Sequence, residues 1–305
     1  MKYDIAIIGA GPAGLSAAIY AQRAGYTTVC FEQNIHGGQI INTPEVENYP
    51  ALGKISGVEY AMALYNQAVG FGAQVVYTPV QGAQLTGEVK KLQTPAGEVQ
   101  AGAVIIANGV VRRKLECPGE DKFIGRGVSY CATCDGNFFT GKTVAVVGGG
   151  NTALEDAVYL AGLCEKVYLV HRRDEFRAAP HEVAKALKNP KIQPVYSHVP
   201  TAIEGDNKVQ RLVLESKKTG EETTLEVAAV FVAVGLIPQN EIFKGTLPLS
   251  ETGYILAGED CKTEIPGVFA AGDTRQKTLR QLITAAADGA IAATNAAAYL
   301  GEREG

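Results

Sequence analysis

The sequence predicts an α/β protein with two Rossmann-like dinucleotide-binding domains, the second inserted into the first. Two glycine-rich loops carry this prediction, at residues 9–14 and 148–153. Each follows a short apolar strand and precedes an alanine-rich helix, which is the order of elements in a dinucleotide-binding unit. Each unit also has a later apolar strand that leads to a glycine, at Gly109 and at Gly235, so one architecture occurs twice.

The first unit opens with an apolar strand over residues 5–8. A helix is expected over 14–24, because alanine and larger apolar residues recur there at helical spacing and Gly25 can end it. A second strand over 28–31 leads to Glu32, where a carboxylate would meet the ribose hydroxyl of an adenosine.

The glycines of the first loop, Gly9, Gly11 and Gly14, follow the pattern G-x-G-x-x-G. They allow a tight turn and let a pyrophosphate approach the N-terminus of the helix, where the dipole favours negative charge. A chance glycine turn is the usual alternative, and the surrounding strand, helix and strand argue against it.

The second unit repeats this order, with a strand over residues 143–147, a helix over 154–163 and a strand over 167–170. Its loop follows the pattern G-x-G-x-x-A, with Ala153 at the last position. We therefore expect a second dinucleotide site here.

The second unit is predicted to be an insertion. After it, the chain offers one short strand, 267–271, and one helix, about 279–299, which cannot form a core of their own. We expect them to complete the first domain, so that residues 1–114 and 241–305 form one domain and 115–240 the other. Proline and glycine near both junctions are typical of linkers.

Composition argues against several classes of partner. Of 305 residues, 46% are apolar and 20% are charged, and the net charge is −4, so neither nucleic acid nor an anionic membrane is an expected partner. No apolar run approaches the ~20 residues that span a bilayer. The sequence opens without the pattern of a signal peptide, and we expect a cytoplasmic, reducing location.

Two of the six cysteines, Cys131 and Cys134, form a C-x-x-C pair. A zinc ribbon would need a second such pair or two histidines at similar spacing, and the sequence has neither, so a redox role is favoured over a metal. Cys30 and Cys164 lie in apolar segments and are expected to be packed thiols. Cys117 and the remaining cysteine carry no readable role.

Asp135 follows the pair directly, and we expect a short helix or turn to open there. The N-terminus of a helix favours the thiolate, which is the reactive form in disulfide exchange. Asp135 is then either an ordinary acidic residue of a first turn or the group that gives and takes protons for the dithiol, and both can hold. Phe138 and Phe139 are either core residues or an apolar patch that docks a protein substrate.

Four potential cations follow the strand over residues 167–170: His171, Arg172, Arg173 and Arg177. Where an acidic residue would select NAD, guanidinium groups suit the additional 2′-phosphate of NADP. The alternative is a solvated basic surface, and the position at a nucleotide loop favours NADPH.

Together these motifs resemble the low-molecular-weight, bacterial-type NADPH-dependent thioredoxin reductases, over essentially the whole chain. The motifs that carry the resemblance are G-A-G-P-A-G (9–14), G-G-Q-I (37–40), V-E-N-Y-P (46–50), G-R-G-V-S-Y-C-A-T-C-D-G (125–136), G-G-G-N-T-A (148–153), H-R-R-D-E-F-R (171–177) and A-G-D-T-R-Q-K-T-L-R-Q-L (271–282). The cysteine motif with its flanks is the most specific of them.

The resemblance implies that the discontinuous domain binds FAD and that the inserted domain binds NADPH. For FAD it implies the residues Gly9, Gly11, Pro12, Ala13, Gly14, Glu32, Gln33, Gly38, Gln39, Asn48, Gly272, Asp273, Arg280, Gln281 and Leu282. For NADPH it implies Gly148, Gly150, Asn151, Thr152, Ala153, His171, Arg172, Arg173 and Arg177.

The resemblance also implies how the dithiol works. Cys134 would be the cysteine nearer the flavin, Cys131 would attack the disulfide of thioredoxin or a thioredoxin-like protein, and Asp135 would be the acid–base partner. The family is homodimeric, and its inserted domain rotates so that the dithiol faces either flavin or substrate. This chain differs from the usual family pattern at Asn108 and in residues 49–53.

Two other functions share parts of this pattern. The same scaffold could act as a flavin dithiol oxidase that uses oxygen, but an oxidase has no need of the arginines at 172, 173 and 177. A flavin-bearing redox sensor without turnover is the second alternative, and Asp135 beside the cysteine pair argues against it.

Overall fold

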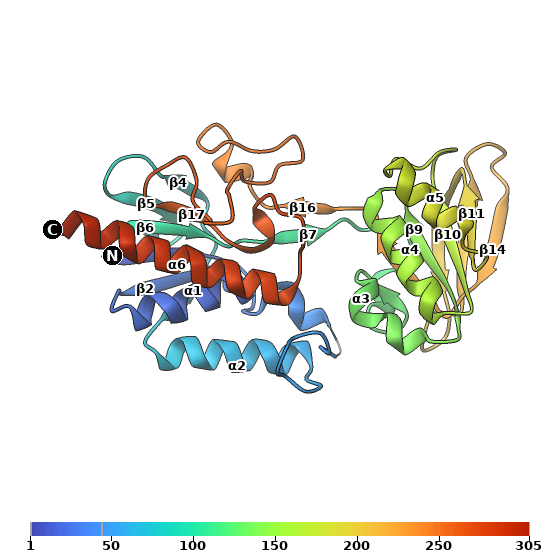
Figure 1. Cartoon of the computed structure of the whole chain (residues 1–305), viewed down its shortest axis with the longest axis horizontal. Coiled ribbons are helices and arrows are strands. Elements are labelled where there is room, and N and C mark those ends of the chain that lie inside the picture. Colours follow the sequence, from blue (N-terminus) through green and yellow to red (C-terminus); the bar gives the residue numbers. More distant parts are fainter. Residues whose placement is uncertain (1, 44, 305) are drawn as a thin grey trace. The chain divides into compact units, whose positions relative to one another are not determined.

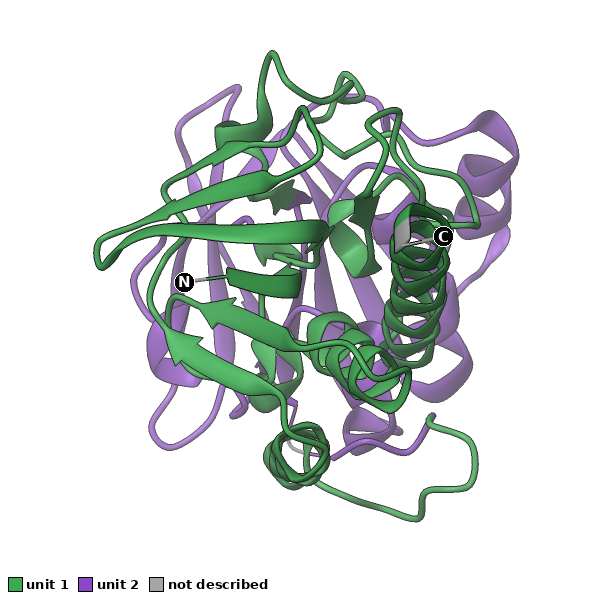
Figure 2. Cartoon of the chain, turned by 90° about the vertical axis from the view of Figure 1, so that its left-hand side faces the viewer, with its two compact units in different colours: residues 1–42, 49–111, 237–305 green, residues 43–48, 112–236 purple. Residues whose placement is uncertain are grey.

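The computed structural model describes residues 2–43 and 45–304, which form two compact units. Unit 1 comprises residues 1–42, 49–111 and 237–305, and unit 2 comprises residues 43–48 and 112–236 (Figure 2). The junctions expected from the sequence, 114/115 and 240/241, lie a few residues beyond these limits. The short segment 43–48 belongs to unit 2, which no sequence pattern indicated.

Unit 1 is built on a sheet of mainly parallel strands in the order β3-β2-β1-β6, with β17 also paired to β6. The parallel strands are β1 (Lys2–Ile8), β2 (Thr28–Glu32), β3 (Gln74–Tyr77), β6 (Gly97–Ile106) and β17 (Val268–Ala270). The strand β5 (Lys90–Thr94) pairs antiparallel with the first half of β6, and β4 (Gly82–Gln84) pairs antiparallel with β5.

The two faces of this sheet carry separate cores. Ile5 and Ile7 face helices α1 (Pro12–Arg23) and α6 (Leu282–Glu304), whereas Ala6 and Ile8 pack on the other face, because successive side chains of a strand point to opposite sides. Figure 1 shows α6 running alongside α1, and α2 (Gly57–Gly70) packs against α1 in turn.

The close approach of α1 and α6 depends on one glycine. A Cβ on Gly289 of α6 would lie 2.1 Å from the carbonyl oxygen of Ala13 in α1, closer than two such atoms can come. The two helices therefore touch backbone to backbone just after the first glycine loop.

Unit 2 repeats the design with a parallel sheet in the order β11-β10-β9-β15-β8. Its strands are β8 (Val128–Ser129), β9 (Thr143–Gly148), β10 (Lys166–His171), β11 (Ile192–Tyr196) and β15 (Ala229–Ala233). Its helices are α3 (Ala132–Asp135), α4 (Asn151–Leu163) and α5 (Pro180–Lys188). Val144 and Val146 pack with α4, as Ile5 and Ile7 pack with α1 in unit 1.

The opposite face of the second sheet is covered by an antiparallel sheet that the sequence analysis did not anticipate. It consists of β12 (His198–Glu204), β13 (Arg211–Ser216) and β14 (Glu222–Glu226). Leu212 and Leu214 of β13 pack in the same core as Ala145 and Val147 of β9. The chain passes between the units through β7 (Val110–Arg112) and β16 (Leu236–Pro238), which pair with each other.

The predicted α/β class and both strand–loop–helix–strand repeats are confirmed. Both loop helices begin earlier than predicted, at Pro12 and Asn151, because Gly11 and Gly150 are their N-caps. The predicted last helix, about 279–299, differs from α6, which begins and ends later and runs from Leu282 to Glu304. None of the helices in the described ranges has both the length and the apolarity needed to cross a membrane.

Candidate active site and nucleotide loops

In the first glycine loop, two of the three glycines leave no space for a Cβ. A Cβ on Gly9 would lie 2.3 Å from the carbonyl oxygen of Ala107, and Gly9 has φ +105°, in the left-handed region that favours glycine. A Cβ on Gly14 would lie 1.9 Å from the carbonyl oxygen of Gly9. A Cβ on Gly11 would meet the Cα of Gly38 at 3.8 Å, an ordinary van der Waals contact, so this position alone is free of a clash.

The second loop has the same design. A Cβ on Gly148 would lie 2.4 Å from the carbonyl oxygen of Ala233, whereas nothing lies within 4 Å of one on Gly150. Ala153 takes the place of Gly14 and is fully buried. The middle glycine of each loop is also the N-cap of a helix and makes no side-chain cap bond. These N-capping glycines fit the pyrophosphate of a dinucleotide, which needs the free backbone N–H groups of a helix N-terminus.

Glu32 is tied to the first loop. Its carboxylate accepts the backbone N–H of Ala10 at 3.0 Å and that of Asn34 at 3.0 Å. The carboxylate predicted to bind ribose therefore lies at the rim of the loop. Gln33 is exposed next to it, and Pro12 and Ala13 form the first turn of α1.

His171 packs against the second loop. It is 5% exposed, and its Nε2 has no hydrogen-bond partner among the described residues. Burial lowers the pKa of His171, and the nearby charges of Arg177, Arg172 and Arg173 lower it further, although a backbone hydrogen bond at Glu175 opposes this. His171 is therefore buried beside the loop rather than one of a set of exposed cations.

The three arginines of the predicted NADPH site are exposed, and none has an ion-pair partner in the described part of the chain. Arg177 is joined to the loop, because its backbone N–H donates to the carbonyl oxygen of Gly149 at 2.7 Å. The side chain of Asn151 accepts the backbone N–H of Ala179 at 2.8 Å, and Thr152 is exposed. The structure thus brings the loop and the arginine segment of unit 2 together.

The cysteine pair lies at the start of the short helix α3, as predicted. Cys131 is the N-cap and Cys134 lies inside the helix, and the two sulfurs are bonded at 2.11 Å with a Cα–Cα distance of 5.3 Å. Asp135 follows in the same turn, and its pKa is raised by burial, against the opposing effects of a hydrogen bond from Ser129 and the charge of Arg112. Ser129 was not singled out from the sequence.

Cys30 and Cys164, which the sequence predicts to be packed thiols, are buried in the structure. Both are free thiols, and burial raises the pKa of Cys30 to about 12. Cys261 is buried and Cys117 is half-buried. In residues 2–43 and 45–304, no three histidine, cysteine or acidic side chains lie close enough to hold a metal.

The two phenylalanines after the cysteine motif have different environments. Phe139 packs against the core of unit 2 and meets the ring of Phe231 edge to face, at 5.7 Å between centroids. Phe138 is 48% exposed. One is therefore a core residue, and only the other could serve a partner.

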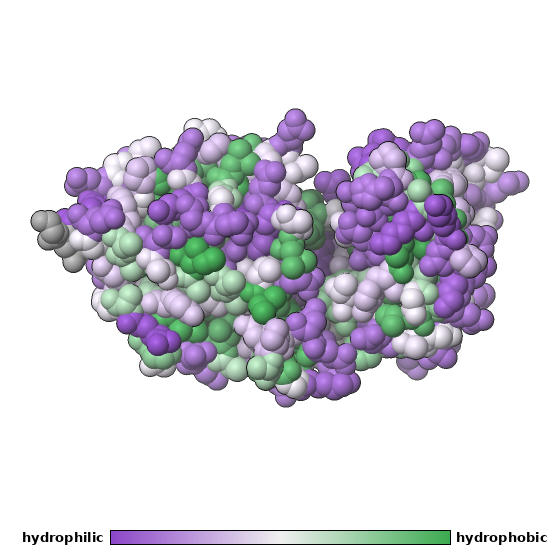
Figure 3. Space-filling model, viewed as in Figure 1, coloured by the Kyte–Doolittle hydropathy of each residue, from purple (hydrophilic) through white to green (hydrophobic). Residues whose placement is uncertain are grey.

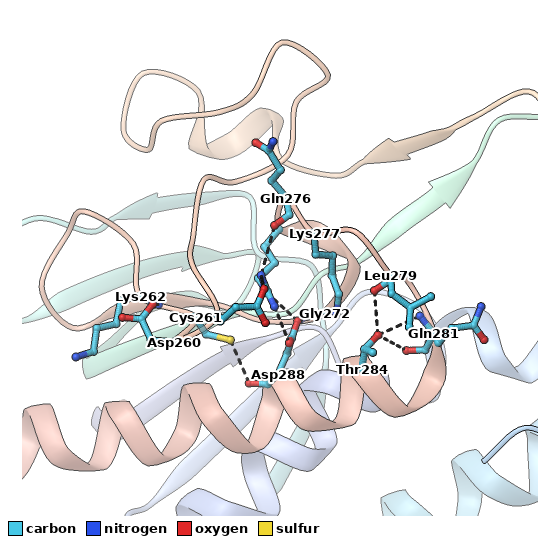
Figure 4. Close-up of polar contacts among 12 residues, drawn as sticks. Asp260, Cys261, Lys262, Gly272, Gln276, Lys277, Leu279, Gln281, Thr284 and Asp288 are labelled. Atoms are coloured by element: carbon cyan, nitrogen blue, oxygen red, sulfur yellow. Dashed lines mark hydrogen bonds and ion pairs between the residues drawn. The ribbon is translucent and has the colours of Figure 1, made fainter. Parts of the chain in front are cut away.

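The turn predicted to lie at the flavin is held by a residue that the sequence analysis missed. Figure 4 shows Asp288 of α6 reaching the turn η5 (Gly272–Thr274). Its carboxylate accepts the backbone N–H of Gly272 at 2.9 Å, two bonds from Arg275 at 2.8 and 2.9 Å, and one from Lys277 at 2.8 Å. Burial raises the pKa of Asp288, but the hydrogen bonds from the two cations outweigh this and lower it.

The segment after this turn is also ordered by hydrogen bonds. The backbone N–H of Gln281 donates to the hydroxyl of Thr284 at 3.1 Å, as Figure 4 shows, and Leu282 then begins α6. The guanidinium of Arg280 lies 4.1 Å from the ring centroid of Tyr254, and its Nε is buried with no partner among the described residues.

The family-atypical Asn108 belongs to a polar network in unit 1. Its Nδ2 donates to the carbonyl oxygen of Gln239 at 2.5 Å and to Oδ1 of Asn240 at 3.2 Å. Asn240 is 2% exposed and accepts the hydroxyl of Thr274 at 2.7 Å. The network connects the end of β6 with the turn η5, next to the predicted flavin residue Asp273.

The structure does not bring all predicted FAD residues into one unit. Gly38 and Gln39 lie in the turn η1 (Gly38–Asn42) of unit 1, and a Cβ on Gly38 would lie 3.3 Å from the Cα of Gly11. Asn48, by contrast, lies in the segment 43–48 that belongs to unit 2.

Comparison with known proteins agrees with this geometry. The pyridine nucleotide-disulphide oxidoreductase family matches residues 3–289. The thioredoxin reductase of Peptoclostridium acidaminophilum is 45% identical over 305 residues, which cover 98% of this chain and 97% of that protein. The chain belongs to the thioredoxin reductases. Another thioredoxin reductase, that of Treponema pallidum, is 45% identical over 302 residues, covering 98% and 97% of the two chains.

A solved thioredoxin reductase, that of Streptococcus pyogenes, has a TM-score of 0.93 with this chain at 41% identity, and the match covers 99% of both chains. That of Giardia duodenalis has a TM-score of 0.93 at 40% identity, covering 98% of this chain and 99% of that one. Membership of this family of oxidoreductases implies FAD and NAD(P)H as cofactors. The redox centre of this thioredoxin reductase is the disulfide Cys131–Cys134.

Proposed function

We propose that this thioredoxin reductase carries electrons from NADPH, by way of FAD, to the disulfide Cys131–Cys134 and on to the disulfide of thioredoxin or a thioredoxin-like protein. The observation that supports this most is the combination, in one chain, of two glycine loops whose middle glycine caps a helix and a C-x-x-C disulfide beside a partly buried carboxylate. A binding protein without turnover needs no such carboxylate.

Unit 1 is proposed to hold FAD. Gly11 caps the N-terminus of α1, where the pyrophosphate would lie, and Glu32 offers a carboxylate to the adenosine ribose. The predicted residues Gly38, Gln39, Gly272, Asp273, Arg280, Gln281 and Leu282 would line the rest of the site.

Unit 2 is proposed to hold NADPH. Gly150 leaves room for its pyrophosphate, and the exposed guanidinium groups of Arg172, Arg173 and Arg177 would bind the 2′-phosphate. Charge-assisted hydrogen bonds of this kind contribute about 1.5–3 kcal/mol each, which is enough to favour NADPH over NADH.

When bound, the two nucleotides supply the electron pair that converts the Cys131–Cys134 disulfide into two thiols. Cys131 is proposed to lose its proton to water and to attack the partner's disulfide as a thiolate, which forms a mixed disulfide and releases one partner thiolate. Asp135 gives this thiolate its proton. Asp135 then takes the proton of Cys134, and the sulfur of Cys134 attacks the sulfur of Cys131. The Cys131–Cys134 disulfide forms again, and the second partner thiolate leaves and is protonated by water.

A homodimer is proposed from the family resemblance. Figure 3 shows hydrophobic residues exposed over the helices of unit 1, and Tyr20, Met62, Ile283 and Ile291 are among those more than one-third exposed. A partner copy would cover such side chains, and light scattering during gel filtration would give the mass. A reducing, cytoplasmic location is proposed because four of the six cysteines are free thiols.

An anaerobic titration tests the proposed electron path. The oxidised protein is mixed with NADPH, and separately with NADH, while the visible band of the flavin is followed. Rapid bleaching by NADPH and slow bleaching by NADH are expected. A yellow protein that NADPH leaves oxidised would exclude NADPH as the donor, and a protein that takes up no FAD would contradict the assignment of unit 1.

A further inference from the structure

A serine hydroxyl joins the cysteine pair to its neighbouring carboxylate. Ser129 ends β8, two residues before Cys131, and is 5% exposed. Its hydroxyl lies 2.5 Å from Oδ2 of Asp135 and 3.1 Å from the backbone nitrogen of Cys131. All three residues belong to unit 2.

The proton of the hydroxyl goes to Asp135. A serine hydroxyl has one proton to donate and two lone pairs that accept. The N–H of Cys131 donates to Oγ, and the hydroxyl then donates to the carboxylate, since the alternative acceptor, the carbonyl oxygen of Cys131, is more distant at 3.3 Å. The chain of bonds therefore runs from Cys131 through Ser129 to Asp135.

The two oxygens of Asp135 are left in different states. Oδ2 is occupied by Ser129, whereas Oδ1 is buried and has no hydrogen-bond partner among the described residues. A carboxylate that exchanges a proton needs one oxygen free of other donors. Oδ1 meets this condition.

We propose that Ser129 is a positioning residue of the redox centre, which holds Oδ2 of Asp135 so that Oδ1 is the oxygen that gives and takes the proton of the dithiol. The inference rests on the proposed function. Ser129 keeps its own proton throughout. The proton that leaves Oδ1 for the first partner thiolate is replaced by the proton of the Cys134 thiol, so the carboxylate returns to its starting state.

The effect of Ser129 on the proton affinity of Asp135 has a definite sign. A hydroxyl that donates to a carboxylate stabilises its charged form and so lowers its pKa, as Arg112 also does by its charge, while burial acts in the opposite direction. The other titratable groups at this turn are the thiols of Cys131 and Cys134 in the reduced protein. Replacing Ser129 by alanine is therefore expected to raise the pKa of Asp135.

The first test needs no turnover. The carboxyl ¹³C shift of Asp135, assigned by its loss in Asp135→Asn, is titrated in the oxidised protein. Ser129→Ala should raise the midpoint, Ser129→Thr, which keeps the hydroxyl, should leave it near the wild-type value, and Ser216→Ala should not change it. Ser216 is the control because it is a buried serine of unit 2 whose hydroxyl accepts backbone N–H groups in a distant turn. An unchanged midpoint in Ser129→Ala would overturn the inference.

The second test is a double-mutant cycle. Protein reduced with dithiothreitol and desalted is mixed with bis(2-hydroxyethyl) disulfide, an aliphatic disulfide whose leaving thiolate needs a proton, and the loss of free thiols is followed. Asp135→Asn should slow the reaction about 100-fold or more, and Ser129→Ala about tenfold. The double variant should match Asp135→Asn, because Ser129 acts through Asp135.

The outcomes separate the role of Ser129 from the proposed electron path. A double variant that is about tenfold slower than Asp135→Asn would overturn the role of Ser129, since the serine would then act independently of the carboxylate. Failure of NADPH to bleach the flavin, with the midpoint still raised in Ser129→Ala, would reject the proposed electron path and leave the link between Ser129 and Asp135 standing.

Discussion

Gly149 lies directly against the imidazole ring of His171, and a Cβ built on this glycine would lie 2.2 Å from two atoms of that ring. The second nucleotide loop is thus shaped by a side chain from the end of the next strand. His171 cannot retreat easily, because it is buried and its ring also lies 5.5 Å from that of Phe176.

Adjacent glycines of this loop should therefore behave differently. Gly149→Ala forces the ring of His171 to move and should lower the free energy of unfolding by about 1–3 kcal/mol, the usual cost of overpacking. Gly150→Ala meets no atom within 4 Å and should leave the unfolding free energy nearly unchanged, while it weakens NADPH binding by entering the space of the pyrophosphate. Urea unfolding and calorimetric titration with NADPH measure the two effects. Equal destabilisation by both substitutions would contradict this account.

The arginines should set the preference for NADPH. Arg172→Gln combined with Arg173→Gln should reduce the ratio of NADPH to NADH affinity about 100-fold, because two charge-assisted hydrogen bonds to the 2′-phosphate are lost. NADH affinity should change little, since NADH has no such phosphate. Lys188→Gln, which removes an exposed cation at the end of α5 in the same unit, is the control. If Lys188→Gln lowered the ratio of NADPH to NADH affinity as much as the double arginine variant does, total charge rather than position would set the preference.

Alkylation should distinguish the redox pair from the other cysteines. Burial raises the pKa of Cys117 to about 11 and that of Cys261 to about 12, so few of these thiols are ionised at pH 7.5. After mild reduction, iodoacetamide should modify Cys131 and Cys134, and without reduction it should modify neither. Peptide mass spectrometry gives the sites, and urea-unfolded, reduced protein, in which all six cysteines react, is the control. Rapid modification of Cys117 in the folded protein would be the contrary result.

Asp156 should make the stability of unit 2 depend on pH. Burial, with a smaller effect of Glu155, raises the pKa of Asp156 to about 7, whereas in the unfolded chain it is about 3.9. Between these values the folded state holds a proton that the unfolded state lacks, so stability falls as the pH rises, by up to about 1.4 kcal/mol per pH unit.

Asp156→Asn removes this dependence. Its gain in unfolding free energy over the wild type should be absent near pH 4 and complete above pH ~7, when measured by urea unfolding at several pH values. Asp206→Asn removes an exposed carboxylate of the same unit and should show no such trend. A gain for Asp156→Asn that is largest at low pH would reverse the sign argued here.

Asp288 should matter for both the stability and the flavin content of unit 1. Asp288→Asn leaves Arg275 and Lys277, which are almost fully buried, without their anion and should cost about 3–5 kcal/mol. It should also lower the fraction of protein purified with FAD, because the N–H of Gly272 must then share one neutral amide oxygen with Arg275 and Lys277. Glu259→Gln is the control, since Glu259 is 93% exposed and 3.5 Å from Arg275. Full flavin content in Asp288→Asn would separate this ion pair from the flavin site.

The sequence predicted those features that depend on local pattern. Ile5, Ile7 and the glycines after them define a strand, a turn and a helix within one short segment, and the same pattern returns at Val144 and Val146. The C-x-x-C pair was also found, because its spacing alone limits its chemistry.

The residues that were missed act across the fold. Ser129 and Asp288 are ordinary polar residues in the sequence, and their roles come from hydrogen bonds to Asp135 and to Gly272 that exist only when strand, turn and helix are assembled. The antiparallel sheet of unit 2 was not predicted, because Leu212, Val213 and Leu214 form one short apolar run, and nothing in that run tells which face of the second sheet it would cover.

The parallel pairing of β6 with β17 has a consequence for how the chain folds. Val104 pairs with Val268, so the central sheet of unit 1 cannot be completed until β17 has left the ribosome. Apart from the segment 43–48, unit 2 is continuous from 112 to 236 and can fold first. Its early folding keeps the ends of the insertion together, because β7 and β16 leave and return side by side, and this shortens the search that β17 must make for β6.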